Sequence, residues 1–407
     1  MYSNSRQIQL FWEKDVMIIL IQNGKLCTMH GKAFFGDIRI KHGKIAEIGV
    51  GLEHKKHEKV IDASGLWVLP GFIDPHTHLG VGEQGIGFEG NDVNEYSSPI
   101  TPHLRGIDAY NPEDTAVLES IQAGVTSVAI GPGSANVLGG LFSMIKLRHD
   151  SVDTALIKEG VGMKSALGEN PKRVGRDSSR MPMTRMGTAA KLREALFLAT
   201  EYLEKNERYE ADPENNEQAS FDMKWESLIP VLKKELPLKV HVHRADDILT
   251  AIRIAKEFDL KFSLDHCSDG HLITDYIAES GATAIVGPTL GFRTKMETRN
   301  KTFETPGILN DAGVRVAITT DHPVVPLREL RICAAYAARY GMGQEEALKA
   351  ITIYPAEIVG LNDRIGSLES GKDADIVLWS GNPLEVFSEA KLVLIDGKVM
   401  FDALSDS

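Results

Sequence analysis

Eight short apolar segments between residues 68 and 321 constrain the fold of this 407-residue chain more than any other feature. Helical patterns, with apolar residues three or four apart, separate most of them, as in PEDTAVLESIQAG and ADDILTAIRIAKEF. Strands that are apolar along their whole length are typical of a parallel sheet covered on both faces. Eight of them predict an α/β fold, a (β/α)8 TIM-type barrel. The segments are 68–74, 126–131, 141–147, 158–166, 238–243, 261–266, 282–287 and 314–321.

The two ends of the chain have a different texture. Short alternating strands with Asn-Gly or His-Gly turns fill residues 16–67, and similar segments return near the C-terminus. Such turns indicate antiparallel hairpins. We therefore expect a small β-sandwich domain made of residues 16–67 and 365–405. The barrel domain would be residues 68–364, with an insertion around 168–237 on the catalytic face, and residues 1–15 have no assigned role.

The composition excludes several classes of partner. Asp and Glu number 57 against 45 Lys and Arg, a formal net charge of −12, whereas nucleic acids and anionic membranes need a basic face. No run approaches the roughly 18 apolar residues of a membrane span, and the N-terminus lacks the features of a signal peptide. Three widely spaced cysteines exclude a disulfide framework. We expect a cytoplasmic protein with a small-molecule substrate, and a closed homo-oligomer is the general expectation for such enzymes.

Histidines and one aspartate follow four of the apolar segments. The carboxyl ends of barrel strands form the mouth of the barrel, so these side chains are expected to converge there. A single histidine of this kind is more often an ordinary core or surface residue, but four such strand ends favour a site. Imidazoles combined with a carboxylate are typical of zinc rather than of magnesium or calcium. The residues are His76, His78, His241, His243, His266 and Asp321.

The motif PGFIDPHTH, followed in order by HVH, DH and TTD, resembles the metal-dependent amidohydrolase superfamily. The resemblance extends from residue 16 onward and includes the passage GSLESGKDADIVLW. Within the superfamily the chain is most similar to the imidazolonepropionase-related group, which has dipeptidase-like members. The segments PGSANVLGG and ALGENPKR indicate an uncharacterised branch of that group. The resemblance implies a hydrolase that cleaves a C–N bond, in an amide or cyclic amide, of a small polar substrate.

The same resemblance implies roles for the strand-end residues. His76 and His78 match the first metal pair, and His241 matches the ligand of the fifth strand. His266 matches a histidine that either binds metal or polarises the substrate carbonyl. Asp321 matches the carboxylate that binds metal and shuttles the proton of a metal-activated hydroxide. One or two Zn²⁺ ions are expected, and five ligands favour two.

Four further residues are candidates around that centre. Lys164 stands where the fourth strand should end, and in binuclear relatives a carboxylated lysine bridges the metals there; a plain lysine is the alternative. Burial would favour the neutral amine that carboxylation requires. Glu169 is the rival bridging ligand. His243 and Arg244 are expected to bind substrate, the arginine through a carboxylate, although most arginines are solvated surface residues.

Two other functions are compatible with the sequence. A deaminase of the same fold would release ammonia and would use a glutamate shortly after His241, where the chain has Val, His, Arg, Ala, Asp and Asp. A metal-free scaffold without activity is the second alternative. Such relatives lose their ligand histidines, whereas here the set is intact.

Overall fold

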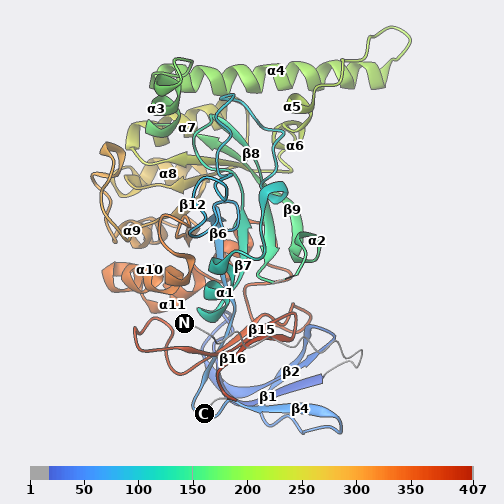
Figure 1. The fold of residues 1–407 in the computed structure, drawn as a ribbon, viewed down its shortest axis with the longest axis vertical. Coiled ribbons are helices and arrows are strands. Elements are labelled where there is room, and N and C mark those ends of the chain that lie inside the picture. Colours follow the sequence, from blue (N-terminus) through green and yellow to red (C-terminus); the bar gives the residue numbers. More distant parts are fainter. Residues whose placement is uncertain (1–17, 149, 406–407) are drawn as a thin grey trace.

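The computed structural model describes residues 18–148 and 150–405, so the segment 1–15 lies outside the described residues. A barrel with its surrounding helices forms the upper part of the molecule, and a second sheet made from both chain ends forms the lower part (Figure 1). Among the described residues, no helix has both the length and the apolar character needed to cross a bilayer.

The barrel sheet contains eight strands that are neighbours in their chain order, which confirms the predicted architecture. Helices pack outside it, and the carboxyl ends of most strands carry the polar residues of interest. The strands are β6 (Phe72–Thr77), β7 (Val125–Ile130), β8 (Leu138–Lys146), β9 (Leu156–Ala166), β10 (Leu238–Val242), β11 (Phe262–His266), β12 (Thr283–Val286) and β13 (Val316–Ile318).

The expectation of an all-parallel barrel sheet was wrong for one strand. β8 runs antiparallel to both β7 and β9, whereas the other neighbouring pairs are parallel. A parallel connection needs a crossover of about a dozen residues or more, and the links 131–137 and 147–155 are too short. The Gly-rich link 131–137 therefore turns back at the carboxyl end of β7, where the other strands present their polar residues.

Side-chain and backbone hydrogen bonds close the barrel between its first and last strands. Asp74 in β6 accepts hydrogen bonds at 2.8 Å from both the backbone N and the Oγ1 of Thr320, which follows β13. Next to these contacts, Ile73 N donates to Ile351 O at 2.8 Å and Ile318 N donates to Ala350 O at 2.9 Å. The segment around residue 350 thus bridges the two strands.

The apolar segment 68–74 divides between the two sheets. β5 (Trp67–Pro70) pairs with strands of the second sheet, and β6 begins after Gly71. A Cβ at Gly71 would lie 2.1 Å from Thr126 Oγ1, so only glycine permits the close approach of the chain as it enters the barrel. Trp379 stacks on Phe72 at a centroid separation of 5.2 Å and joins the two parts.

The second sheet has the order β16-β15-β14-β5-β1-β2-β3, with β4 beside β1, and it confirms that both chain ends build one unit. Its strands form a single hydrogen-bonded sheet around an apolar core of their own. In β14, Ile376 and Leu378 face this core, whereas Val377 and Trp379 join the barrel core. The remaining strands are β1 (Ile18–Leu26), β2 (Phe34–Lys41), β3 (Lys44–Gly49), β4 (Glu58–Asp62), β14 (Ile376–Trp379), β15 (Ala390–Ile395) and β16 (Lys398–Asp402).

A buried charge cluster also joins the sheets. Lys146 at the end of β8 donates hydrogen bonds to Asp373 at 2.8 Å, to Asp375 at 3.1 Å and to Asp396. Burying the ammonium without these carboxylates would be costly. The KDAD sequence directly before β14 therefore anchors the second sheet beneath the barrel.

The helices cover the barrel, and four of them belong to the insertion. Within the insertion, α4 lies across the top of the molecule and runs past its body (Figure 1). The helices are α1 (Thr115–Gln122), α2 (Val152–Ala155), α3 (Glu169–Asp177), α4 (Arg185–Ala211), α5 (Met223–Glu226), α6 (Ile229–Leu232), α7 (Ala245–Glu257), α8 (Thr274–Ser280), α9 (Thr305–Asp311), α10 (Leu330–Ala337), α11 (Gln344–Lys349) and α12 (Ile353–Ile358).

Candidate metal centre

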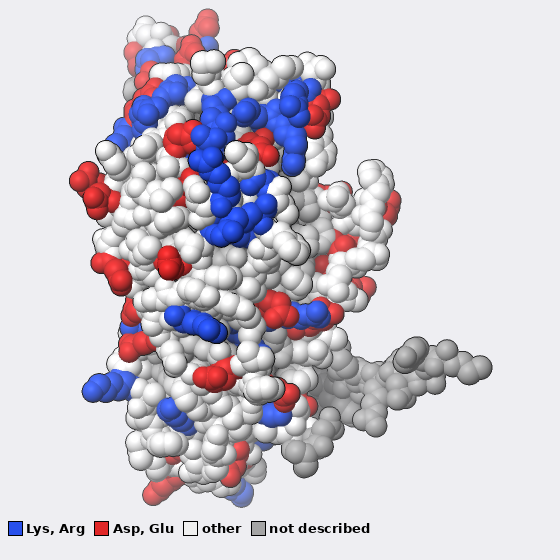
Figure 2. Space-filling view, turned by 90° about the vertical axis from the view of Figure 1, so that its left-hand side faces the viewer, with Lys and Arg blue, Asp and Glu red and all other residues white. Residues whose placement is uncertain are grey.

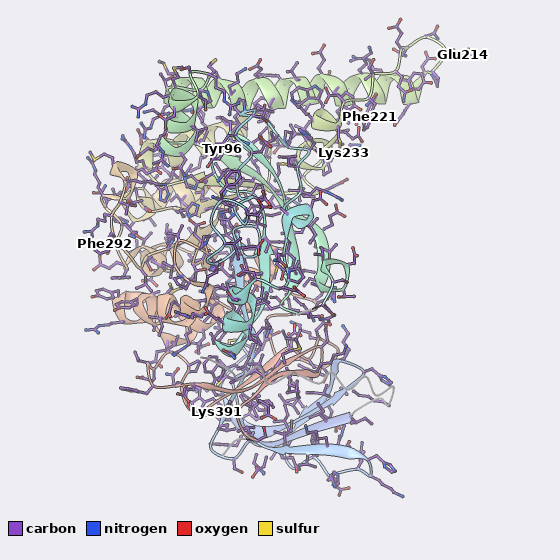
Figure 3. The ribbon with its side chains drawn as sticks, in the orientation of Figure 1. Tyr96, Glu214, Phe221, Lys233, Phe292 and Lys391 are labelled. Carbon is purple, nitrogen blue, oxygen red and sulfur yellow. The ribbon has the colours of Figure 1, made fainter. Side chains whose placement is uncertain are left out.

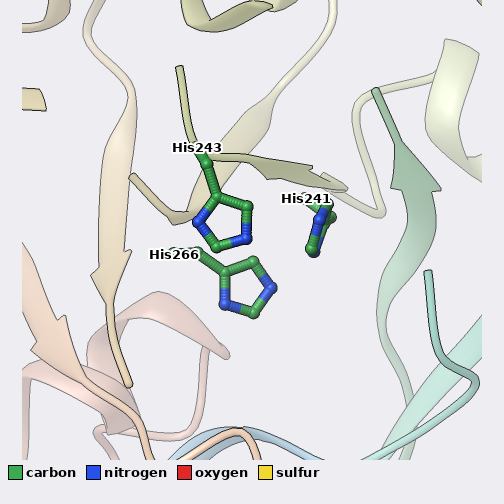
Figure 4. A group of neighbouring side chains, drawn as sticks. All are labelled: His241, His243 and His266. Carbon is green, nitrogen blue, oxygen red and sulfur yellow. The ribbon is translucent and has the colours of Figure 1, made fainter. Parts of the chain in front are cut away.

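The five strand-end histidines lie together although they come from three separate stretches of the chain. The His266 ring is central, with its centroid 4.4 Å from that of His241 and 5.0 Å from those of His76 and His243. All five rings are buried. Figure 4 shows His241, His243 and His266 gathered at the ends of neighbouring strands.

Two groups of candidate metal ligands are present among the described residues. His76, His78 and Asp321 form one, and His241, His243 and His266 form the other; within each, the ligand atoms lie within 4.8 Å of one another. Asp321 connects them, because its Oδ1 lies 3.3 Å from His78 Nε2 and its Oδ2 lies 3.9 Å from His266 Nδ1. The arrangement is consistent with a binuclear metal centre.

Backbone strain accompanies the strand ends at this centre. His266 and Asp321 have φ angles of 74° and 52°, in the left-handed region that residues with side chains rarely adopt. Such strain persists only where surrounding contacts determine the conformation, and it is common at functional sites. Here it directs both side chains into the cluster.

Hydrogen bonds fix the orientation of three imidazoles. The Nδ1–H of His78 donates to Gly131 O and that of His266 donates to Gly287 O, each at 2.8 Å. The Nδ1–H of His76 donates to Asp265 Oδ2 at 2.6 Å. A neutral imidazole that donates from Nδ1 has its lone pair on Nε2. Each ring is therefore held in the tautomer that can ligate a metal through Nε2.

Burial keeps four of the five histidines neutral. It lowers the pKa of His76 to about 3, assisted by the positive charge of Lys164, and it lowers the pKa of His243 to about 4. The pKa values of His241 and His266 also lie well below the ordinary value, chiefly because of burial. Metal ions bind only the neutral imidazole, so the cluster is prepared for ligation at neutral pH.

His241 shows that the donor set suits a metal ion. Its Nδ1 is buried and has no hydrogen-bond partner within the described part of the chain, and its Nε2 lies 3.3 Å from Asn170 Nδ2. Buried polar atoms are rarely left unpaired. An unpaired nitrogen within a group of neutral imidazoles and one carboxylate fits a borderline divalent cation.

A cavity of about 360 Å³ opens over the centre. His78, His241, His243 and Asp321 form part of its wall, together with Ser134 of the Gly-rich link. That link reaches the mouth of the barrel, as its place after the second barrel strand predicts. The exposed side chains of Tyr96 and Phe292 also line the cavity, and both project from loops (Figure 3).

A model of the amidohydrolase family matches residues 67–400 of this chain. The chain belongs to the amidohydrolase family. An amidohydrolase from Thermotoga maritima MSB8 is 42% identical, and its crystal structure matches with a TM-score of 0.91 over 94% of this chain and 100% of that one. Amidohydrolases act on carbon–nitrogen bonds, and this chain is an enzyme of that class with a substrate that is not defined.

Two curated relatives extend the comparison. Amidohydrolase tasK from Hapsidospora irregularis is 30% identical over 91% of this chain, which spans 40% of the length of tasK. An imidazolonepropionase from Acinetobacter baumannii is 27% identical over 89% of this chain and 90% of its own length. The predicted relationship to the imidazolonepropionase group is thereby confirmed.

Lys164 of this amidohydrolase lies beside the first ligand group. Its side chain is fully buried in β9, with Nζ 2.9 Å from His76 Nε2. Among the described residues, no carboxylate oxygen lies within 4 Å of this ammonium, because Asp265 pairs instead with Lys239 at 3.0 Å. Burial lowers the pKa of Lys164 to about 8.

Two of the predicted site residues lie away from the ligand groups. Glu169 begins α3, where its backbone N donates to Glu297 Oε2 at 2.8 Å, and its carboxylate belongs to neither group. Arg244 donates to both carboxylate oxygens of Asp246 at 2.9 Å and does not line the cavity. His243, in contrast, lines the cavity and lies within the second ligand group.

Sequence reasoning missed four residues that contact the site. Lys239 could have been found, since it shares the strand face of His241 in the alternating segment LKVHVH. Asp265 precedes His266 and should face away from it, but the left-handed φ of His266 turns that ring inward, onto the side that Asp265 faces. Asn170 and Glu297 lie on loops and helix starts, where no periodic pattern identifies them.

Proposed function

We propose that this amidohydrolase is a zinc-dependent hydrolase that cleaves an amide or cyclic amide bond of a small polar substrate, with Asp321 as proton shuttle. The observation that carries the proposal is the position of Asp321. Its carboxylate contacts histidines of both ligand groups and lines the cavity. A carboxylate there can both hold a metal and exchange a proton with a substrate in the cavity.

The donor set supports two ions. His76, His78 and Asp321 would hold one and His241 and His266 the other, which is more than one tetrahedral zinc with an open position can use. When bound, zinc lowers the pKa of water to about 7 and polarises the scissile carbonyl. His266 is assigned as a ligand, because its Nδ1–H donates to Gly287 O and its Nε2 has no proton to give to an oxyanion.

Asp321 has the charge that a proton shuttle needs. Burial alone would raise its pKa, but the imidazoles of His266 and His78 hold the pKa well below its ordinary value. The carboxylate is therefore ionised at neutral pH and able to accept a proton from the attacking water. It would then return that proton to the leaving nitrogen.

Lys164 is proposed as the bridging ligand after carboxylation. The burial that lowers its pKa to about 8 increases the fraction of neutral amine, the form that reacts with CO₂. Addition of CO₂ to this amine forms an N–C bond and releases one proton, which leaves a carbamate anion. That anion would screen two neighbouring dications and would replace an ammonium that repels them. Glu169, the alternative, starts a helix outside both groups.

An activity screen tests the proposal. Zinc-loaded and metal-stripped protein would be incubated with N-acyl amino acids, dipeptides and cyclic amides, and new carboxylate and amine groups would be measured. We expect turnover of at least one class by the zinc-loaded protein, abolished by Asp321→Asn. Turnover that is unchanged after metal removal would contradict the metal-dependent mechanism.

A deaminase remains a second candidate because of Glu297. The sequence has no glutamate shortly after His241, yet Glu297 places Oε1 3.9 Å from His241 Nε2 and 3.8 Å from His243 Nε2. A carboxylate at this position could assist proton transfer to a leaving amino group. Ammonia release from amino-substituted heterocycles would support this function, whereas amide cleavage without ammonia would contradict it.

A further inference from the structure

One segment beside the cavity is unusually basic for this chain. Residues 293–301 contain Arg293, Lys295, Arg299 and Lys301 against the single carboxylate of Glu297, whereas the whole chain has a net charge of −12. Figure 2 shows lysine and arginine side chains gathered in the upper half of one face of the molecule. Lys295 and Lys301 line the cavity over the metal centre. A local surplus of positive charge at a substrate cavity favours an anionic ligand.

The two cavity lysines differ in what their ammonium groups contact. Lys301 Nζ donates to the carbonyl oxygens of Leu290 and Gly291 at 3.2 Å and of Phe292 at 3.3 Å. An ammonium has three donors, so these contacts occupy all of them. Lys301 therefore holds the loop at the rim of the cavity rather than a ligand.

Lys295 has one donor left. Its Nζ donates to Asn170 Oδ1 at 2.8 Å and lies 3.5 Å from Glu297 Oε1, and no third acceptor contacts it among the described residues. The side chain is 25% exposed and lines the cavity. Its remaining N–H is thus available to a molecule in the cavity.

The contacts of Lys295 also place it close to the reacting centre. Asn170 lies between Lys295 and His241, with its Nδ2 3.3 Å from His241 Nε2. Glu297 lies between Lys295 and His243, with its Oε1 3.8 Å from His243 Nε2. One side chain therefore separates the ammonium from the histidine group. A substrate whose amide lies at the histidines would reach Lys295 with a group a few bonds away.

We propose that Lys295 binds a carboxylate of the substrate, so that the substrates are small amides or cyclic amides with a free carboxylate. This inference rests on the proposed metal-dependent hydrolysis. A charge-assisted hydrogen bond from an ammonium suits a carboxylate, and partial burial reduces the screening of the pair. Lys295 takes the role that the sequence suggested for Arg244, which is paired with Asp246 outside the cavity.

Paired metal-binding probes test the carboxylate site directly. The monohydroxamates of malonate, succinate and glutarate would bind metal at one end, and each would be matched with the same molecule in which a carboxamide replaces the carboxylate. Dissociation constants would be measured by calorimetry on zinc-loaded protein at low salt. For at least one chain length we expect the carboxylate probe to bind about tenfold tighter than its carboxamide partner.

Two variants test whether Lys295 is the residue that causes the preference for the carboxylate probe. In Lys295→Gln the ratio between the paired probes should fall to about one, because the remaining hydrogen bond is no longer charge-assisted. Arg299→Gln removes a positive charge from the same segment at an exposed position outside the cavity, and it should keep the wild-type ratio. A ratio that survives in Lys295→Gln would overturn the assignment.

If the variants fold poorly, the binding of the paired probes to the wild-type protein alone still tests the carboxylate site. Equal binding of both members of every pair would overturn the carboxylate site and leave the proposed hydrolase standing. Binding of no hydroxamate at all by the zinc-treated protein would count against the metal centre itself, and the carboxylate site would fall with it.

Discussion

The carboxylate of Asp265 accepts the Nδ1–H of His76 at 2.6 Å and pairs with the ammonium of Lys239 at 3.0 Å. Both charged groups are buried directly beneath the candidate metal ligands. The Asp265 carboxylate compensates the buried charge of Lys239 and fixes the tautomer of His76. Because it pairs with Lys239, Lys164 has no carboxylate partner among the described residues. One aspartate thus orients a candidate metal ligand and influences the electrostatics of the proposed bridging lysine.

Asp265→Asn keeps the shape of the side chain but removes its charge. We expect the protein to lose about 3–5 kcal/mol of unfolding free energy, because Lys239 becomes an uncompensated buried charge. We also expect zinc affinity to fall about 10–100-fold, as is usual when the partner of a ligand histidine is altered. Chemical denaturation and competitive zinc titration measure the two effects.

A second substitution separates these effects. Adding Lys239→Met to Asp265→Asn removes the uncompensated ammonium and should restore most of the stability, while zinc binding stays weak. If the double variant regains wild-type zinc affinity, Asp265 acts only through the charge of Lys239 and not through His76.

Asp321→Asn tests the proton shuttle. The amide can still contact His78, so the fold and part of the zinc content should remain. It cannot accept the proton, and kcat should fall much further than KM rises, by an expected factor of at least about 10². Steady-state kinetics on a substrate from the screen, with zinc analysis of the same sample, check this. Near wild-type kcat would show that another group serves as the base.

Lys164→Ala tests the proposed bridge. The variant should lose bound zinc, from two ions per chain towards one or none, since it lacks the anion that screens the ions. Short-chain carboxylic acids such as acetate or propionate should restore part of the zinc content by occupying the place of the carbamate. Two ions retained without added acid would exclude Lys164 as the bridge, and one ion in the wild type would contradict a binuclear centre.

The metal-stripped protein should become less stable as the pH falls below about 6.5. Unfolded histidines take up a proton near that pH, whereas burial lowers the pKa of folded His76 to about 3 and of His243 to about 4. The unfolded state therefore binds more protons between pH 6.5 and 4, and stability falls with decreasing pH in this window by about 1.4 kcal/mol per pH unit for each such histidine.

Urea denaturation at pH 7, 6 and 5 measures this slope. His243→Gln should reduce it, because the substitution removes a group that takes up a proton in this pH window only in the unfolded state. Unfolding free energies that stay constant from pH 7 to 5 would mean that the buried histidines take up protons in the folded state.

Local patterns in the sequence were sufficient to predict the barrel strands, the polar residues at their ends and the family. Continuous apolar segments identified the eight barrel strands. A strand that is buried on both faces is apolar along its whole length, irrespective of which strands and helices pack against it. The histidines at positions 76, 78, 241, 243 and 266 could be predicted as neighbours from their places in the sequence. The carboxyl end of every barrel strand lies at the mouth of the barrel, so residues at these ends lie near one another. The turn-rich texture of both chain ends likewise indicated their shared sheet.

Tertiary contacts decided what no local pattern encodes. The direction of β8 follows from the length of its links, and the left-handed backbone of His266 turns this residue inward beside Asp265. Arg244 pairs with its neighbour Asp246, whereas Lys295 reaches the cavity from a loop more than fifty residues further on. The sequence by itself determined which helices and strands form, because hydrophobic periodicity is a local property. Only the tertiary structure decided which charged side chains are paired and which remain free for a ligand, because ion pairs depend on neighbours that are distant in the chain.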